Sequence, residues 1–144
     1  MRHNFVLLLI VVVFSLCIHD SPQTAPSGAL TDVTQENQIL VVHFHRVAQC
    51  TCCINVGEWA EETVREFFPR EFESGTIQYL DVCVEDNPEL ASKYNAYGAS
   101  LYINIVKEGR DNITETMDVW QYCFDHDNYV RVMKTVLETA LEQL

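Results

Sequence analysis

Three cysteines stand within four residues, Cys50-Thr51-Cys52-Cys53, and these side chains are the best suited to chemistry in the chain. Cys50 and Cys53 have the two-residue spacing that brings two sulfurs within disulfide reach across one helical turn. A thiol at the start of a helix is stabilised as a thiolate by the helix dipole and by unpaired backbone N–H groups. The spacing therefore predicts a redox pair in which Cys50 attacks and Cys53 resolves.

Cys52, the cysteine between them, has several interpretations that the sequence leaves open. It is a third redox thiol, an alternative resolving partner, a soft-metal ligand, or a side chain that faces away. Cys50, Cys52 and Cys53 together are the candidate ligands for a soft ion. His45 is a candidate to polarise Cys50 or to complete a four-ligand site, although its spacing matches no established zinc pattern. His43 is a weaker candidate because it lies further from the cysteines.

The remaining cysteines of the folded part are expected to be structural. Cys83 and Cys123 are predicted to be small buried hydrophobic side chains, and a bridge between these two stays open. An odd count of five cysteines beyond the N-terminal segment favours a reactive thiol over a disulfide framework. Trp59 and Trp120 are predicted core anchors, and Trp120 is also a candidate to line the redox cleft.

The N-terminal segment has the pattern of a targeting sequence. Arg2 is followed by a mostly apolar run from Phe5 to Ile18, which is short for a membrane span and typical of a signal peptide. We assign residues 1–30 to a signal peptide, or to a membrane anchor through residues 5–18, plus a linker, and residues 31–144 to a folded domain. The segment predicts an exported protein that is periplasmic, extracellular or membrane-tethered.

Composition limits the classes of function. The chain has 144 residues and is 48% hydrophobic, which supports one domain with a full core. It carries 9 Lys and Arg against 21 Asp and Glu, a formal net charge of −12. Because neutralising phosphates requires clustered basic residues, this balance argues against a nucleic-acid partner.

The elements that must position the cysteines follow from hydrophobic periodicity. The run from Gln38 to His45 is predicted to be a strand covered on both faces. A helix starting near Ile54 and ended by Pro69 is expected to bury Trp59 and Phe67. Further along, the pattern predicts strands at 76–84, 101–107 and 113–117, the last two as an antiparallel hairpin, and helices at 88–94 and from 127 to the end.

The order strand, helix, strand, helix, strand, strand, helix predicts an α/β fold with a mixed four-stranded sheet flanked by helices. With Cys-x-x-Cys directly after the central strand, the stretch 38–144 resembles the thioredoxin-like fold. Two departures stand out. Thioredoxins carry a cis-proline before the third strand, where this chain has Gly98-Ala99-Ser100-Leu101, and the Gly-Pro between the two cysteines is replaced by Thr51-Cys52.

More specifically, the chain is similar to the family of nitrophenyl compound nitroreductase subunit ArsF. Phe44 at the strand end, Cys50 and Cys53, the acidic helix around 58–66 and Trp120 before the last helix carry this resemblance. The resemblance implies a redox role, as a nitroreductase-associated subunit, without fixing a substrate.

The sequence thus predicts an exported thioredoxin-like thiol-disulfide protein, in which a disulfide of a protein or small molecule is the substrate and a redox partner protein restores the pair. No cofactor is expected. The alternatives are a soft-metal or metalloid binding module that uses Cys50, Cys52 and Cys53, and a non-catalytic subunit of a redox complex.

Overall fold

The computed structural model describes residues 37–144, and the predicted signal peptide or anchor and its linker lie outside the described residues. The elements follow the predicted order with two short additions, a five-residue helix after the first long helix and a 3-10 turn before the last. They are β1 (Asn37–His45), α1 (Thr51–Phe67), α2 (Pro69–Glu73), β2 (Ile77–Cys83), α3 (Pro88–Tyr94), β3 (Ser100–Lys107), β4 (Arg110–Glu115), η1 (Trp120–Tyr122) and α4 (His126–Leu141).

The sheet is mixed and four-stranded, with strand order β2-β1-β3-β4. β1 runs parallel to β2 and antiparallel to β3, and β3 runs antiparallel to β4. β1 therefore has a neighbour on each side and helices on each face, which explains its continuous apolar run. The predicted fold class and the antiparallel pairing of the last two strands are confirmed.

The hairpin between β3 and β4 turns at Glu108 and Gly109. Both residues have positive φ, 53° and 72° respectively. This backbone is that of a two-residue type I′ turn, whose twist matches that of the flanking strands. The turn fixes the register that pairs Lys107 with Arg110.

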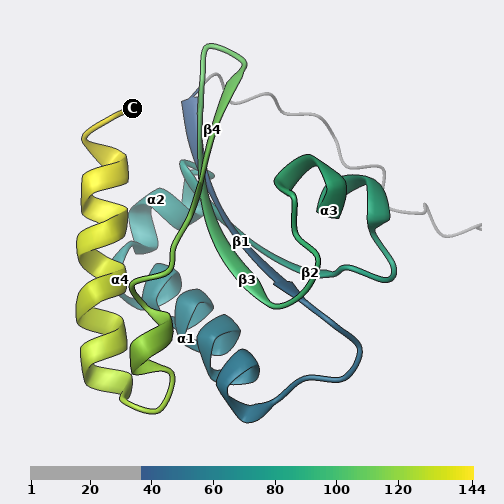
Figure 1. The fold of residues 1–144 in the computed structure, drawn as a ribbon. Coiled ribbons are helices and arrows are strands. Elements are labelled where there is room, and N and C mark those ends of the chain that lie inside the picture. The colour runs from purple at the N-terminus through teal and green to yellow at the C-terminus, as the bar shows by residue number, and fades with distance from the viewer. Residues whose placement is uncertain (1–36) are drawn as a thin grey trace, which may run out of the picture. The chain divides into compact units, whose positions relative to one another are not determined.

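Two hydrophobic cores lie on opposite faces of the sheet, with α1, α2 and α4 on one face and α3 on the other (Figure 1). β1 supplies both cores by alternation, since Ile39 and Val41 belong to the first while Val42 and Phe44 belong to the second. On α1 the buried side that faces the sheet is made of Val56, Gly57, Ala60, Thr63 and Val64. The predicted packing of this helix on the sheet is confirmed.

The predicted end of α1 before Pro69 is confirmed, whereas the predicted start and the predicted burial of Phe67 were wrong. The helix begins at Thr51 rather than near Ile54, because Cys50 takes the N-cap position in an extended conformation. Phe67 is 41% exposed, and Lys134 Nζ lies 4.2 Å from its ring centroid, so Phe67 is not the core residue that was expected. Phe68, at 6% exposure, enters the core instead, where the chain turns before Pro69.

Candidate redox site

Cys50 and Cys53 lie at the first turn of α1, and their sulfur atoms are 2.7 Å apart. Both belong to the free cysteines of the described residues. Cys50 is exposed because it is the N-cap residue and precedes the helix. Cys53 is half-buried because it lies within the first turn of the helix. A disulfide between the two would need little movement of the backbone.

The two thiols differ in acidity because the hydrogen bonds between them favour the thiolate form of Cys50 and the protonated form of Cys53. The Cys53 Sγ–H and the Cys53 backbone N–H, 3.4 Å from Cys50 Sγ, both stabilise the thiolate and lower the pKa of Cys50. Burial raises the pKa of Cys53, and its hydrogen bond to Cys50 adds to the rise. This asymmetry is the one that an attacking Cys50 and a resolving Cys53 require.

Cys52 forms a disulfide with Cys123, which lies just after η1 and 71 residues further along the chain. Adjacent residues of a helix point in directions about 100° apart, so Cys52 leaves the exposed side occupied by Cys50 and faces the α1–α4 core. Cys123 is buried as predicted, but the expectation of an unbonded side chain was wrong. With Cys52 bonded, the candidate ligand set Cys50, Cys52 and Cys53 does not offer three free thiols.

The open bridge between Cys83 and Cys123 is also excluded by this disulfide. Cys83 is a free, half-buried thiol at the end of β2, and its sulfur lies 3.3 Å from Glu85 Oε2. Burial and this contact raise the pKa of Cys83. Across residues 37–144, no three His, Cys, Asp or Glu side chains are grouped closely enough to hold a metal ion.

A shallow cavity of about 210 Å³ adjoins the two sulfurs. Its lining comes from the β1–α1 loop, from both cysteines and from Ala99 of the loop before β3, with Arg46, Ala48 and Gln49 as the loop residues. Arg46 Nη2 donates to the carbonyl of Tyr97 at 3.2 Å and joins the two loops. Ala99, from the loop before β3, therefore lines the same cavity as the two cysteines.

The two loops that contribute to this cavity also carry exposed apolar side chains. Val47 and Tyr97 are 76% and 80% exposed, and each belongs to one of the two loops that the Arg46 hydrogen bond joins. Trp120 is absent from the residues that line the cavity in the described chain, so the alternative that it lines the redox cleft is not supported, and its predicted place as a core anchor is the one observed. It packs against the core on the α1 and α4 side instead.

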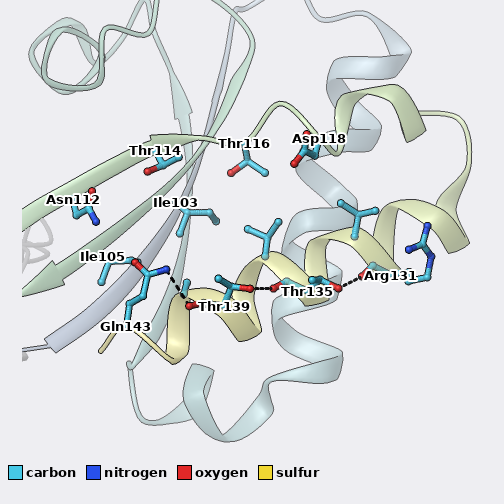
Figure 2. A pocket seen from close by; sticks show the side chains of 13 residues that line it. Ile103, Ile105, Asn112, Thr114, Thr116, Asp118, Arg131, Thr135, Thr139 and Gln143 are labelled. Carbon is cyan, nitrogen blue, oxygen red and sulfur yellow. Dashed lines mark hydrogen bonds between the residues drawn. The ribbon is translucent and has the colours of Figure 1, made fainter.

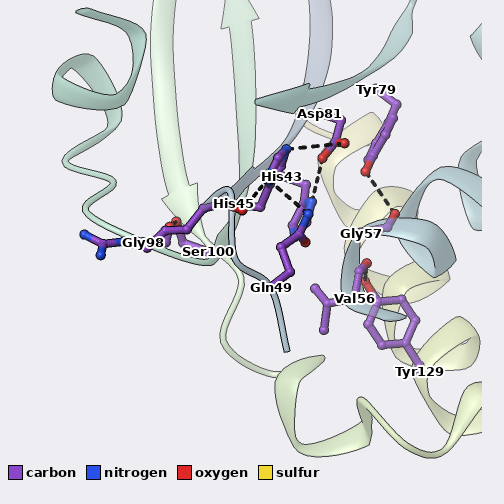
Figure 3. A network of polar contacts seen from close by, with 11 residues as sticks. His43, His45, Gln49, Val56, Gly57, Tyr79, Asp81, Gly98, Ser100 and Tyr129 are labelled. Atoms are coloured by element: carbon purple, nitrogen blue, oxygen red, sulfur yellow. Dashed lines mark hydrogen bonds and ion pairs between the residues drawn. The ribbon is translucent and has the colours of Figure 1, made fainter. Parts of the chain in front are cut away.

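A polar network lies beneath the site, on one face of β1 and β2 (Figure 3). The Asp81 carboxylate accepts from His43 Nδ1 at 2.8 Å and lies 3.6 Å from His45 Nε2. His45 Nδ1 lies 3.1 Å from Gln49 Nε2 and 2.9 Å from the Arg46 carbonyl. His45 thus engages its own loop and Asp81, and the predicted contact with Cys50 is not among its interactions within residues 37–144.

His43, the weaker candidate by its position in the sequence, is the more constrained of the two histidines. Its side chain is 2% exposed, and a Cβ at Gly57 would overlap its imidazole ring. Only glycine at position 57 lets α1 approach the strand this closely. The sequence contains two signs of this contact, a histidine within an apolar strand and a glycine on the apolar face of a helix. Neither sign shows that these two residues pack against each other.

The first two turns of α1 are held by hydrogen bonds from both sides. Tyr79 on β2 donates its hydroxyl to the Gly57 carbonyl at 3.0 Å, and Tyr129 on α4 donates to the Val56 carbonyl at 2.7 Å (Figure 3). Asn55 donates to the Cys123 carbonyl at 2.8 Å, beside the disulfide. These bonds and the Cys52–Cys123 crosslink fix the helix start that carries the two thiols.

A larger cavity, of about 440 Å³, lies away from the sulfurs between α4 and the β3–β4 hairpin (Figure 2). Its floor is apolar, and threonines line both sides. On α4, Thr135 and Thr139 donate their hydroxyl groups to backbone carbonyls one turn earlier. These hydroxyl hydrogens are satisfied within the helix, and no thiol lines this cavity among the described residues.

The order of elements, the mixed sheet β2-β1-β3-β4 and a Cys-x-x-Cys turn at the start of the helix after the central strand define a thioredoxin-like fold. Two solved structures are similar in fold. A thioredoxin of Fasciola hepatica is 22% identical with a TM-score of 0.39, and the match covers 54% of this chain and 66% of that chain.

The second is a structure of the first two thioredoxin domains of Naumovozyma dairenensis Eps1p, with 16% identity and a TM-score of 0.46. That match covers 78% of this chain and 41% of the other. No family model and no curated protein matches the chain. Within residues 37–144, no helix is both long and apolar enough to cross a membrane.

Proposed function

We propose that this protein exchanges disulfides with a protein or small-molecule substrate through Cys50 and Cys53. The observation that supports the proposal is the pair itself, with two free sulfurs 2.7 Å apart, the exposed one more acidic and the half-buried one less so. A structural pair would need neither an exposed sulfur nor this difference in acidity.

The exchange proceeds in two displacements. The Cys50 thiolate attacks one sulfur of the substrate disulfide, and the other substrate sulfur leaves as a thiolate that takes a proton from water. Cys53 then loses its proton and attacks the Cys50 sulfur, which releases the second substrate thiolate. The substrate disulfide is reduced to two thiols, while Cys50 and Cys53 are oxidised to a disulfide that a redox partner protein must reduce again.

Trapping of the intermediate tests this assignment. Cys53→Ser should accumulate a mixed disulfide at Cys50 with a model disulfide such as oxidised glutathione, whereas Cys50→Ser should form none. Intact-mass spectrometry reports the adduct, and Cys83→Ser serves as a control that removes a free thiol at the end of β2, outside the helix turn. Absence of an adduct in Cys53→Ser would contradict the proposal.

We also propose that the protein is exported, with residues 1–30 as the targeting segment. The Cys52–Cys123 disulfide supports this location because such bonds persist in oxidising compartments and are rare in the cytosol. The measurement is the N-terminal sequence and the fractionation of the protein from its native cells. A chain that keeps Met1 and stays with the cytosolic fraction would contradict export.

The resemblance to the ArsF family adds one finer proposal, that the redox partner is part of a nitroreductase-type complex. It rests on the residues named above, such as Phe44 and Trp120, and on no comparison. Co-purification with a nitroreductase from native cells is the test, and a protein that turns over disulfides alone without such a partner would count against it.

A further inference from the structure

A residue triplet on β4, away from the redox site, has the pattern of a modification site. Asn112-Ile113-Thr114 matches the Asn-x-Thr sequence at which exported proteins receive N-linked sugars, and its middle residue is not proline. Among the asparagines of the whole chain, Asn112 alone is followed two residues later by Ser or Thr. Because the triplet lies within β4, the fold shows whether a sugar could be attached there.

The strand that carries the triplet is at the edge of the sheet. β4 is the outermost strand in the order β2-β1-β3-β4, and β3 is its neighbour among the described strands. The side chains of Asn112 and Thr114 are both exposed. Neither has a hydrogen bond to another of the residues drawn in Figure 2. The amide nitrogen that would carry a sugar is therefore accessible in the folded domain.

Alternation along β4 determines the face on which these two side chains lie. Asp111 accepts a hydrogen bond from Asn104 Nδ2 at 2.6 Å, and Ile113 packs against the core on the α3 side of the sheet. Asn112 and Thr114 therefore point to the opposite face, the one that α4 covers in part. Asp111 and Ile113 hold the strand in place, while the two residues of the pattern stay available.

On that face Asn112 and Thr114 line the cavity of about 440 Å³ between α4 and the β3–β4 hairpin (Figure 2). Ile103, Val132 and Val136 give this cavity an apolar floor. The Thr139 hydroxyl, which also lines it, donates to a backbone carbonyl, so its oxygen can still accept a hydrogen bond. A sugar ring offers C–H groups to the floor and hydroxyl groups to such oxygens. The cavity thus suits a sugar attached to one of its own lining residues.

We propose that Asn112 is a glycosylation site, whose amide nitrogen carries an N-linked sugar that lies over the cavity between α4 and the β3–β4 hairpin. This inference rests on the proposed export, because N-linked sugars are added to chains that enter the export pathway. It assigns a modification and is independent of the disulfide exchange at Cys50 and Cys53.

The transfer is balanced and changes no oxidation state. The co-reactant is a lipid-linked sugar phosphate, used by a transferase of the export pathway. The bond between the anomeric carbon of the sugar and the phosphate oxygen breaks, and a bond from this carbon to Asn112 Nδ2 forms. The amide loses one proton, and the lipid phosphate leaves. Thr114 presents its hydroxyl on the same face as the amide, where the transferase can bind both groups together.

A sugar at this position leaves the redox site accessible. The register places Asn112 opposite Ile105, and Ile105 opposite Ile39, close to the start of β1. Cys50 follows the other end of β1. The sugar would instead cover the free edge of β4 and prevent this edge from pairing with a strand of another chain.

Mass spectrometry of the protein from its native cells tests the proposal. After reduction of the disulfide, cleavage at lysines gives the peptide 108–134, which contains Asn112. We expect this peptide to carry a sugar mass that fragment ions locate on Asn112. Asn112→Gln and Thr114→Val, expressed in the same cells, should each lose this mass. Thr114→Ser is the matched control and should keep it, because serine retains the hydroxyl group.

A second measurement tests where the sugar lies. Anilinonaphthalene sulfonate, a dye that binds exposed apolar surface, should bind more strongly to Asn112→Gln than to the glycosylated parent, because the cavity floor is then uncovered. Thr114→Ser, which keeps the sugar, should bind as little dye as the parent. Cooperative thermal unfolding checks that each variant is folded. Equal dye binding by folded Asn112→Gln and parent would overturn the position of the sugar over the cavity.

The outcomes for glycosylation and for export can be told apart. An unmodified Asn112 in the native protein overturns the glycosylation, whichever N-terminus is found. The N-terminal peptide from the same digest reports export, and a chain that keeps Met1 in the cytosolic fraction contradicts the export as well. A processed N-terminus with an unmodified Asn112 overturns the glycosylation alone. A sugar mass that persists in Thr114→Val would also overturn it, because attachment would not follow the Asn-x-Thr pattern.

Discussion

At the scale of single residues, one turn of helix makes two chemically different thiols from two cysteines. Cys50 lies at the N-cap, where its sulfur accepts a hydrogen bond from the Cys53 backbone N–H, whereas Cys53 lies within the first turn of the helix. The difference comes from position alone, which is why the two-residue spacing predicted both residues. Their roles as attacker and resolver stay predictions, and reactivity is the property that tests them.

The first prediction concerns the order of alkylation. Because the pKa of Cys50 is lowered and that of Cys53 is raised, iodoacetamide should modify Cys50 at a lower pH than Cys53 or Cys83. The three clustered cysteines fall in one tryptic peptide, from Val47 to Arg65, so fragment-ion spectra are needed to locate the label. Equal labelling of Cys50 and Cys53 across the pH range would contradict the asymmetry.

The second prediction is a pH dependence of stability. Burial lowers the pKa of His43 in the folded state, so below about pH 6.5 the unfolded chain binds a proton that the folded chain does not. The free energy of unfolding should therefore fall as the pH drops below this value, by at most about 1.4 kcal/mol per pH unit. Urea titrations between pH 5 and pH 8, values chosen as roughly spanning the ordinary pKa of histidine, measure it.

His43→Asn is the control for this effect. It should be less stable than the parent at neutral pH, but its stability should change less over the same interval because the titrating group is gone. The difference between the two curves isolates His43 from His45 and His126. A difference that is constant with pH would contradict a buried neutral imidazole.

At the scale of elements, the middle of α1 and its end before Pro69 were predicted well, whereas its start and the burial of Phe67 were not. Periodicity identifies the buried side through Val56, Ala60 and Val64, because these positions repeat every three to four residues. The first residue of the helix is set by Cys50 as its N-cap. The exposure of Phe67 depends on how α4 packs beside it. The cap is local, but cysteine is not among the usual capping residues, and the exposure of Phe67 depends on the assembled fold, so the hydrophobic pattern alone predicts neither.

A third prediction separates the two aromatic residues of this helix. Trp59 packs in edge-to-face contact with Tyr129, with ring centroids 5.5 Å apart, and also contacts His126. Trp59→Ala should lower the free energy of unfolding by about 3 kcal/mol, the low end for a large core residue because Trp59 is only half-buried. Phe67→Ala should cost less than half of that amount because Phe67 is largely outside the core.

The measurement is equilibrium denaturation of both variants, with Glu62→Ala as a surface reference. Glu62 lies 3.2 Å from His126 in an exposed ion pair, which contributes little. Equal losses in Trp59→Ala and Phe67→Ala would mean that both rings are buried alike in solution.

At the scale of the whole molecule, the fold could be predicted and the second disulfide could not. Strand and helix order follows from local periods of two and 3.6 residues, and the position of Cys-x-x-Cys after the central strand predicts where the candidate site lies. The Cys52–Cys123 bond joins residues 71 positions apart. The two cysteines come close only when α4 packs on α1, so the sequence pattern does not predict their bond. The hydrogen bond between His43 and Asp81 likewise forms only when β1 and β2 pair in the sheet.

A fourth prediction addresses the N-terminal segment. Both hydrophobic cores are made of residues within 37–144, so a chain that lacks residues 1–30 should fold and melt cooperatively. Thermal unfolding followed by near-ultraviolet circular dichroism measures this. Failure of the truncated chain to fold would show that the segment belongs to the domain and is no targeting sequence.

The Cys52–Cys123 bond also closes a covalent ring that contains most of the domain, including the β3–β4 hairpin. Arg110 stands just past the tip of that hairpin with its side chain 81% exposed, where trypsin has access to the chain. A single cut there should leave two fragments that migrate as one band without reductant and separate with it. The disulfide thus holds the two fragments together after the backbone is cut. Separation of the fragments without reductant would show that Cys52 and Cys123 are not bonded.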